Sequence, residues 1–285
     1  MLQIAPSGYR CHAARKRKPE LRCTRAKRDE VLMPQIQAVW QANMQVYGAD
    51  KVWHQMNREG IKVARCTVER LMRRLGLHGV RRGKVVRTTV PDKAAPCPQD
   101  RVNRQFKADR PNQLWVSDFT YVSTWQGWQY VAFVIDVFAR RIVGWRVSSS
   151  MRTDFVLDAL EQALFDRQPE RSDTLIHHSD RGSQYVSILY TERLAEAGIE
   201  PSVGSRGDSY DNALAETING LYKAELIHRR APWKTKEALE LATLEWVAWF
   251  NNHRLLSSIG YIPPAEAEAN YYRQLAGKNE TEVST

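Results

Sequence analysis

The chain has few cysteines and no long apolar segment. Its 285 residues include 4 cysteines, which lack the paired spacing of a zinc site or a disulfide framework. They fit reduced thiols, so a cytoplasmic chain is expected. No apolar run approaches the roughly 18 residues of a membrane span, and the start carries no apolar signal-like core. Membrane proteins and secreted disulfide-rich domains are therefore disfavoured.

Acidic residues are scarce in the first 110 residues. That part carries 25 Lys and Arg against 9 Asp and Glu, a net charge of +16, whereas residues 111–285 carry 17 against 23, a net charge of −6. A basic part joined to a mildly acidic one predicts a polyanion, DNA, held by the first and processed by the second. The alternative is a solvated, solubilising surface. The 43% apolar content and 9 tryptophans indicate folded domains rather than disorder.

The basic part is predicted to hold a small all-α domain over residues 30–80, preceded by a basic flexible arm, residues 1–29. Apolar residues at helical spacing predict helices near 30–44, 49–58 and 65–75. The last two flank a glycine turn and resemble a helix-turn-helix. A three-helix bundle that packs against another element is the alternative. The basic residues expected to contact DNA are Arg65, Arg70, Arg73, Arg74, Arg81, Arg82 and Lys84.

Residues 81–110 contain several prolines and no sustained periodicity, and they are predicted to be a basic linker. From there the pattern alternates between strands and helices. Strand-like runs are 114–122, 129–138, 141–148, 174–178 and 200–203, and helical patterns are 153–165, 186–197, 208–223 and 235–251. This order predicts an α/β fold of the ribonuclease-H-like type over 111–268, a mixed five-stranded sheet with flanking helices. The last helix is expected to bury Leu244, and residues 269–285 to form a polar, frayed tail.

Three carboxylates lie on separate predicted elements of this region. Asp118 interrupts an apolar strand, where aspartate is disfavoured. Asp180 follows a strand end, and Glu216 lies on a helix. Such a set can hold two hard divalent cations through oxygen ligands. Asp136 is as deeply embedded in a strand as Asp118, and alternation alone does not choose between them; a structural pairing of Asp136 with Arg140 or Arg141 is favoured.

The helix that carries Glu216 presents a polar face. Steps of four, three and four residues place Asn212, Glu216, Asn219 and Lys223 on one side, beside a more apolar face. The spacing therefore predicts that Glu216 lies between amide and basic side chains.

Several segments closely resemble the integrase core of bacterial insertion-sequence transposases, the second-frame product of the insertion-sequence-three family, relatives of retroviral integrases. The segments are Trp115-x-x-Asp118-x-Thr120-Tyr121-Val122, Gly127-Trp128-x-Tyr130, Asp136-x-Phe138-x-Arg140, Gly144-Trp145, His178-Ser179-Asp180-Arg181-Gly182-Ser183-Gln184-Tyr185, Asp211-Asn212-Ala213-x-x-Glu216, Phe250-Asn251-x-x-Arg254 and Gly260-Tyr261-x-Pro263-Pro264. Residues 47–79 resemble that family's helix-turn-helix.

The resemblance implies a DDE triad of Asp118, Asp180 and Glu216 that binds two Mg²⁺ or Mn²⁺ ions. It implies cleavage of double-stranded DNA at the ends of a mobile element, followed by transfer of the 3′-hydroxyl into target DNA. Lys223 is expected to contact a phosphate, and Asn212 to orient DNA or a metal-bound water. A homo-oligomer on DNA, an upstream-frame partner or fusion, and a nucleoid-associated location in a bacterium are further expectations.

Two other functions fit parts of the sequence: a DNA-binding regulator without catalysis, and a ribonuclease-H-like nuclease without strand transfer. The intact carboxylates disfavour the first, and the helix-turn-helix pattern disfavours the second. One departure from the family is Leu256, where relatives usually carry histidine. The adjacent His177 and His178 are interpreted as strand-end structure rather than metal ligands.

Overall fold

A computed structural model of the chain forms two compact units, Met1–Val80 and Arg81–Thr285. The residues that the structure describes are 5–81, 107–169, 174–179, 188–203 and 213–283. The two units are described separately below.

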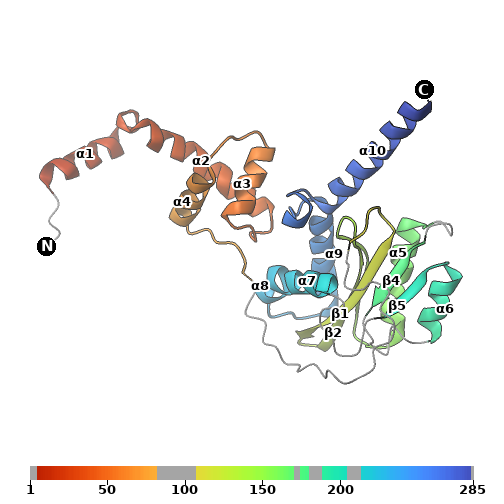
Figure 1. Ribbon diagram of the computed structural model, residues 1–285. Coiled ribbons are helices and arrows are strands. Elements are labelled where there is room, and N and C mark those ends of the chain that lie inside the picture. The colour runs from red at the N-terminus through yellow and green to blue at the C-terminus, as the bar shows by residue number, and fades with distance from the viewer. Residues whose placement is uncertain (1–4, 82–106, 170–173, 180–187, 204–212, 284–285) are drawn as a thin grey trace, which may run out of the picture. The chain divides into compact units, whose positions relative to one another are not determined.

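The N-terminal unit is entirely helical in its described part (Figure 1). Its helices are α1 (Pro6–Arg17), the 3₁₀ turn η1 (Pro19–Leu21), α2 (Thr24–Ala42), α3 (Ala49–Arg58) and α4 (Arg65–Leu75). The positions of α3 and α4 match the predicted helices. The stretch expected to be a flexible arm instead contains α1 and the start of α2. The prediction was wrong because it relied on basic composition, which does not indicate whether the backbone is helical.

Apolar residues at helical spacing form the core of this unit. Val52 and Met56 of α3 pack with Val68 and Leu71 of α4, and all four are buried. Gly76 ends α4 in a left-handed conformation, with φ of +69°, which glycine adopts at little steric cost. The glycine stop that the sequence predicts is therefore confirmed.

The C-terminal unit contains one five-stranded mixed sheet, ordered β3-β2-β1-β4-β5. Its strands are β1 (Leu114–Thr124), β2 (Gly127–Asp136), β3 (Arg141–Ser148), β4 (Ile176–Ser179) and β5 (Glu200–Val203). β1, β2 and β3 form an antiparallel meander, and β4 and β5 add in parallel beside β1. The predicted mixed sheet and meander are confirmed.

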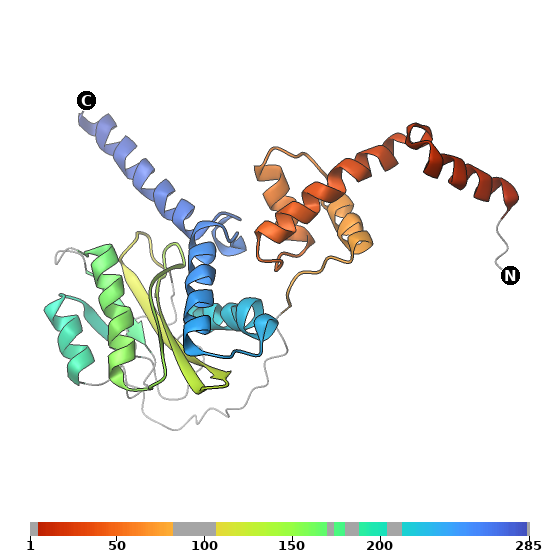
Figure 2. The same cartoon turned by 180° about the vertical axis from the view of Figure 1, so that it is seen from behind.

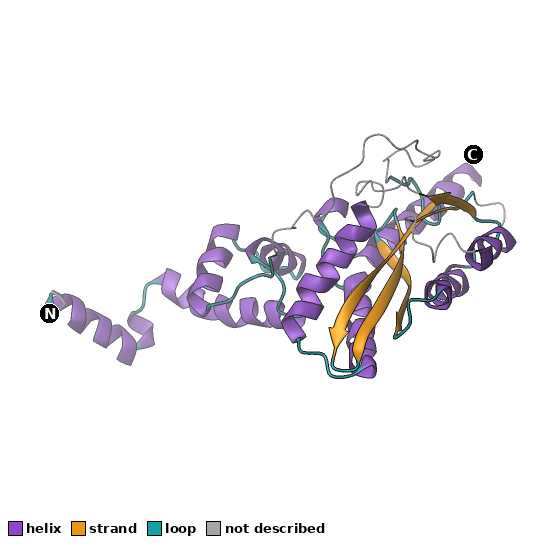
Figure 3. Ribbon diagram, turned by 90° about the horizontal axis from the view of Figure 1, so that it is seen from below, coloured by secondary structure: helices purple, strands orange, loops and turns teal. Residues whose placement is uncertain are grey.

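The α-helices of this unit are α5 (Thr153–Arg167), α6 (Ile188–Glu196), α7 (Ala213–Tyr222), α8 (His228–Arg230), α9 (Lys236–Asn252) and α10 (Pro264–Val283). Among them, α5, α6, α7 and α9 cover the two faces of the sheet (Figures 1 and 3). On one face Leu160 of α5 packs into a buried cluster with Trp115 of β1. On the other, the ring of Phe133 lies 5.2 Å from that of Tyr222 and 6.0 Å from that of Trp246.

Two expectations about the C-terminal helices are wrong. Leu244 of α9 is 51% exposed rather than buried, because it lies on the outer side of a helix whose apolar residues exceed one face. The tail is not frayed, since α10 continues as a helix to Val283 and projects from the sheet (Figure 2). The prediction relied on the polarity of these side chains and overlooked their good helix propensity.

Gly144 of β3 allows α5 to approach the sheet closely. A Cβ atom at this position would lie 2.0 Å from the carbonyl oxygen of Ala159. Gly144→Ala should therefore force the two elements apart and lower the free energy of unfolding by about 2 kcal/mol or more. Urea denaturation measures this loss. Gly277→Ala in α10, where a Cβ meets nothing within 4 Å, is the control and should be neutral or slightly stabilising; an equal effect of both substitutions would contradict the close-approach explanation.

Candidate active site

Asp118 lies on β1, one residue past the last described pair between β1 and β4. The register of β4 along β1 runs from Leu114 to Ser117, whereas β2 continues to pair with Asp118 and beyond. The carboxylate of Asp118 is only partly buried. Asp118 therefore lies on the central strand of the sheet, next to the last described residue pair of β1 and β4.

Helix α7 contacts this carboxylate directly. Asn219 donates from its Nδ2 to Oδ2 of Asp118 at 2.8 Å, and the backbone N–H of Phe119 donates to Oδ1 at 2.8 Å. Asn219 is buried, and its own Oδ1 has no hydrogen-bond partner within the described part of the chain. Glu216 lies three residues earlier on α7 and is exposed. Within the polar face predicted from helical spacing, Asn219 therefore contacts Asp118, whereas Glu216 is exposed.

Lys223 follows on the same face at the end of α7. Partial burial lowers the pKa of its ammonium group, and the nearby Asp118 carboxylate acts in the opposite direction. Its Nζ also lies 4.7 Å from the ring centroid of Tyr121. A cation thus lies near both the Asp118 carboxylate and an aromatic ring.

The other residues predicted for this site, Asp180 and Asn212, lie outside the described residues. The strand before Asp180 is described, and its last residue, Ser179, is in register with Ser117 of β1. In the described ranges, no group of three or more His, Cys, Asp or Glu side chains is arranged to hold a metal ion.

Asp136 has a structural role, but its predicted partners are wrong. It is buried and accepts hydrogen bonds from the backbone N–H of Asn112 at 2.8 Å and of Phe138 at 2.9 Å. Its ionic partner is Arg167 of α5, at 3.2 Å, whereas Arg141 pairs with Glu268. Burial raises the pKa of Asp136, which these donors oppose. The sequence favoured a neighbour in the turn because a partner 31 residues away leaves no local signal.

The adjacent histidines support the sheet. Nε2 of His177 lies 2.7 Å from the hydroxyl of Ser117 and 3.1 Å from that of Tyr190. Nδ1 of His178 lies 3.0 Å from the hydroxyl of Ser202. Both rings are buried, in agreement with the interpretation that they are structural.

Burial makes His177 a source of acid sensitivity. It lowers the pKa of the ring from 6.5 to about 3, so between these values the unfolded chain binds a proton that the folded chain excludes. Stability is fully present above pH 6.5 and should fall by about 1.4 kcal/mol per pH unit as the pH decreases below it. His177→Gln should flatten this dependence, measured by urea denaturation at several pH values. Parallel profiles for both proteins would exclude the role of His177.

The basic residues of the N-terminal unit differ in what they contact. Arg70 is committed to a buried carboxylate, because its guanidinium binds Asp29 with two hydrogen bonds of 2.8 and 2.7 Å. Arg73 is exposed and meets Glu69 at 3.3 Å. The other predicted DNA contacts that the structure describes are exposed: Arg65, Arg74 and Arg81. Arg82 and Lys84 lie outside the described residues.

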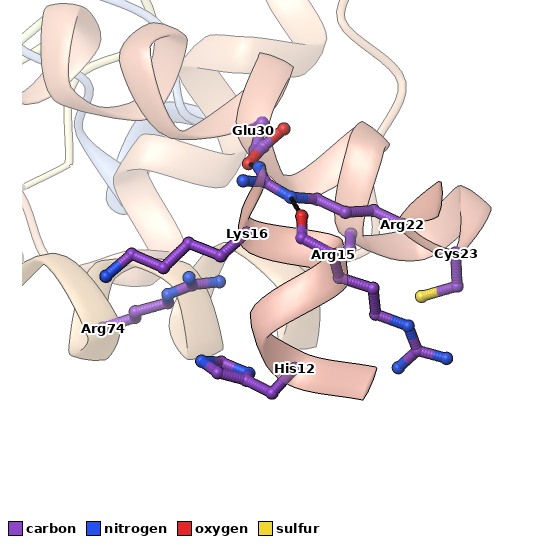
Figure 4. Close-up of a pocket in the computed structure, with 8 residues that line it drawn as sticks. His12, Arg15, Lys16, Arg22, Cys23, Glu30 and Arg74 are labelled. Atoms are coloured by element: carbon purple, nitrogen blue, oxygen red, sulfur yellow. Dashed lines mark hydrogen bonds and ion pairs between the residues drawn. The ribbon is translucent and has the colours of Figure 1, made fainter. Parts of the chain in front are cut away.

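Arg74 also lines a basic cavity that the sequence did not single out. The cavity has a volume of 360 Å³ and lies between α1, α2 and α4. Figure 4 shows basic side chains from these helices around it, with Glu30 ion-paired to Arg22. Its lining residues are His12, Arg15, Lys16, Arg22, Cys23, Ala26, Glu30 and Arg74. These side chains come together because the stretch predicted to be a flexible arm forms α1 and the start of α2.

The C-terminal sequence motif holds helices to the sheet. Asn251 accepts from the backbone N–H of Ile142 at 3.0 Å and donates to its carbonyl at 2.8 Å. Arg254 binds Glu225 at 2.5 Å, and both side chains are buried. Glu225 belongs to a π-helical turn, η2 (Lys223–Ile227), that continues α7. Leu256, the departure from the family pattern, is buried, so its apolar side chain suits its environment.

None of the helices in the described ranges has the length and apolarity needed to cross a membrane.

Known protein families and relatives match nearly the whole chain. A family described as an HTH-like domain matches residues 27–85, and two families described as integrase core domains match residues 108–209 and 197–264. The chain is 62% identical over 274 residues to the transposase for insertion sequence element IS629 of Shigella sonnei, which covers 96% of this chain and 91% of that protein. It is 58% identical over 276 residues to a Mycobacterium tuberculosis protein named for element IS986/IS6110, covering 96% and 98%.

Among solved structures, the catalytic core domain of HTLV-2 integrase in complex with magnesium is similar, with 16% identity and a TM-score of 0.44. The match covers 56% of this chain and 98% of that one.

Proposed function

Since the chain belongs to the insertion-sequence-three family of transposases and carries their integrase core, we propose that Asp118, Asp180 and Glu216 are its catalytic carboxylates. The enzyme is a polynucleotidyl transferase of the DDE type. The reaction is cleavage at the ends of the mobile element, followed by transfer of the 3′-hydroxyl into DNA.

The observation that carries the proposal is the hydrogen bond from Asn219 to Asp118. It fixes α7 against β1, and we take Glu216, one turn before Asn219 on the same side of the helix, to complete the site. An amide that donates to a ligand carboxylate sets its orientation, as outer-shell partners do around metal ions. Asn219 is thus a positioning residue in this proposal.

The described residues suit a hard divalent cation. Asp118 presents two carboxylate oxygens at this point of β1, and each accepts a hydrogen bond of 2.8 Å. Oxygen ligands of this kind favour Mg²⁺ or Mn²⁺, and the integrase core of HTLV-2 is recorded with magnesium. When bound, two such ions activate the attacking oxygen and neutralise the leaving one. Asp118, Asp180 and Glu216 are the residues proposed to hold them.

Each chemical step exchanges one bond at phosphorus. In the first, a water oxygen attacks the phosphodiester at the element end, the bond to the 3′-oxygen breaks, and that oxygen gains a proton. In the second, the freed 3′-hydroxyl loses its proton, attacks a phosphodiester of target DNA and displaces its 3′-oxygen. Lys223, beside Asp118, is proposed to hold a non-bridging phosphate oxygen in both steps. Assembly of a homo-oligomer on DNA belongs to the same proposal.

The helical N-terminal unit is proposed to bind the element ends through its exposed basic residues. Arg73→Ala and Arg74→Ala should each remove about one phosphate contact and lower the slope of log affinity against log salt by about 0.9. Arg70→Ala should instead lower the melting temperature, because it leaves the buried Asp29 without its partner. Fluorescence anisotropy across a salt series and thermal unfolding separate the two effects. Unchanged salt slopes for Arg73→Ala and Arg74→Ala would remove both from the interface.

The proposed function is tested with the purified full chain and labelled DNA from the two ends of its own element. With Mg²⁺ present, nicked ends and joined products are expected. Nicked ends without joined products would identify a nuclease. Binding without either product would identify a DNA-binding regulator.

A further inference from the structure

Three large aromatic side chains are exposed on the β1–β2 hairpin. Tyr121 is 57% exposed, Trp125 69% and Trp128 56%. The rings of Tyr121 and Trp128 contact each other edge to face, with centroids 5.3 Å apart, and Trp125 lies at the turn between the strands. Together these three residues are the hairpin patch. Such rings are costly to leave in water, so a cluster of them marks a binding surface.

The turn that carries the patch is held in place. The backbone N–H of Trp125 donates to the carbonyl of Trp233 at 3.0 Å, and the Gln126 side chain accepts from the backbone N–H of Lys236 at 2.9 Å. The Thr124 hydroxyl donates to the carbonyl of Gly127 at 2.8 Å. A ligand would therefore meet rings that are already positioned, which lowers the entropic cost of binding.

Two lysines lie against these rings. Nζ of Lys223 is 4.7 Å from the centroid of Tyr121, and Nζ of Lys234 is 5.5 Å from that of Trp125. Exposed aromatic rings with interleaved cations are the combination that binds single-stranded nucleic acid, since bases stack on the rings and the cations meet the phosphates. A purely apolar protein partner would gain nothing from the two ammonium groups.

The patch continues from the proposed catalytic centre. Tyr121 is three residues after Asp118 on β1, about 10 Å along the strand, and strand alternation starts the two side chains from opposite faces of the sheet; Lys223 lies near both. Stacked nucleotides of one strand rise about 3.4 Å each, so the patch begins within a few nucleotides of a phosphodiester at Asp118. Lys223 interacts with both Asp118 and Tyr121, which joins the two surfaces.

We propose that the hairpin patch stacks unpaired nucleobases of the DNA strand whose phosphodiester is processed at Asp118. The proposal rests on the proposed function, because it takes DNA as the substrate. Base faces are covered inside a duplex, so the patch would bind only nucleotides that are unpaired at the end or extruded from it. The hairpin thereby selects DNA with an opened end.

The test uses the full chain and two probes: a single strand of about 15 thymidines with one central 2-aminopurine, and a blunt duplex without an overhang. Binding of the single strand should quench the 2-aminopurine, as stacking does. Trp125→Ala and Trp128→Ala should each weaken binding of the single strand by about fivefold or more and reduce the quenching, with duplex affinity unchanged within about twofold. Trp125→Phe and Trp128→Phe, which keep a ring, should retain most of both signals.

Phe165→Ala is the matched control, since Phe165 is 78% exposed on α5 of the same unit and should affect neither probe. Unchanged single-strand affinity and quenching in the alanine variants would overturn the proposal, while duplex binding and end cleavage would leave the proposed function intact. A change in oligomeric state without a change in quenching would assign the patch to a protein contact and would also overturn it. A chain that binds neither probe would overturn both this proposal and the proposed function.

Discussion

Asp118→Asn is expected to abolish end cleavage and strand transfer while DNA binding and folding persist. The amide lacks the charge that a divalent cation requires, and the loss should be at least about a thousandfold, or about 4 kcal/mol of transition-state stabilisation. Folding should persist because the hydrogen bond to Asn219 can be remade. The Oδ1 atom of Asn219 has no partner in the described part of the chain, so a flip of this amide lets it accept from the new side chain.

The measurement is cleavage and joining of labelled element ends, with anisotropy and thermal unfolding on the same preparations. Glu216→Gln should behave like Asp118→Asn, because Glu216 is exposed and its amide costs the fold little. Asp136→Asn is the informative contrast. It should lower the melting temperature together with activity, since Asp136 is 1% exposed and bound to Arg167. Retained cleavage by Asp118→Asn would remove Asp118 from the catalytic set.

Arg254→Leu is expected to lower the free energy of unfolding of the C-terminal unit by about 3–5 kcal/mol. Arg254 and Glu225 are 4% and 7% exposed in their side chains. Removal of the guanidinium leaves a buried carboxylate without its counter-charge, which costs more than the pair itself contributes. Urea denaturation followed by circular dichroism measures the loss.

The double variant Arg254→Leu with Glu225→Leu provides the control. It removes both charges, so it should recover a large part of the stability lost in the single variant. A double variant as unstable as the single one would show that Arg254 acts through packing against Phe250, whose ring it also contacts at 5.4 Å. A single variant as stable as the natural chain would contradict the importance of the pair.

The elements could be predicted where a local pattern is strong. β3 and α3 have the expected bounds, because strand alternation and helical spacing act over a few residues. The polar face of α7 was predicted from the same spacing, and one of its residues, Asn219, contacts Asp118 in the structure. Periodicity could not distinguish Asp118 from Asp136, since both interrupt apolar strands. Their difference is tertiary: Asp118 accepts a hydrogen bond from Asn219 of α7, whereas Asp136 is buried beside Arg167.

The errors share a cause. Composition suggested that both ends of the chain are irregular, yet α1 and α10 are helices. The polarity of a side chain indicates whether it is exposed to water, not whether its backbone is helical. Arg70 was grouped with the DNA contacts because charge was the only signal available, and its tie to Asp29 spans 41 residues. The hairpin patch also escaped notice, since aromatic residues in a strand are usually taken as core.

The π-helical turn η2 fixes how the side of α7 that carries Glu216 and Asn219 is oriented relative to Glu225, the buried partner of Arg254. An α-helix rotates by about 100° and advances about 1.5 Å per residue, and a π turn arises where one additional residue is accommodated. Ordinary α-helical winding through the same residues would over-rotate the segment that follows by about one residue's angle relative to α7. Glu225 would then no longer be aimed at Arg254 while Glu216 and Asn219 kept their orientation. The wider winding of this turn therefore lets one continuous helix direct polar groups toward the proposed catalytic site at one end and into the protein interior at the other.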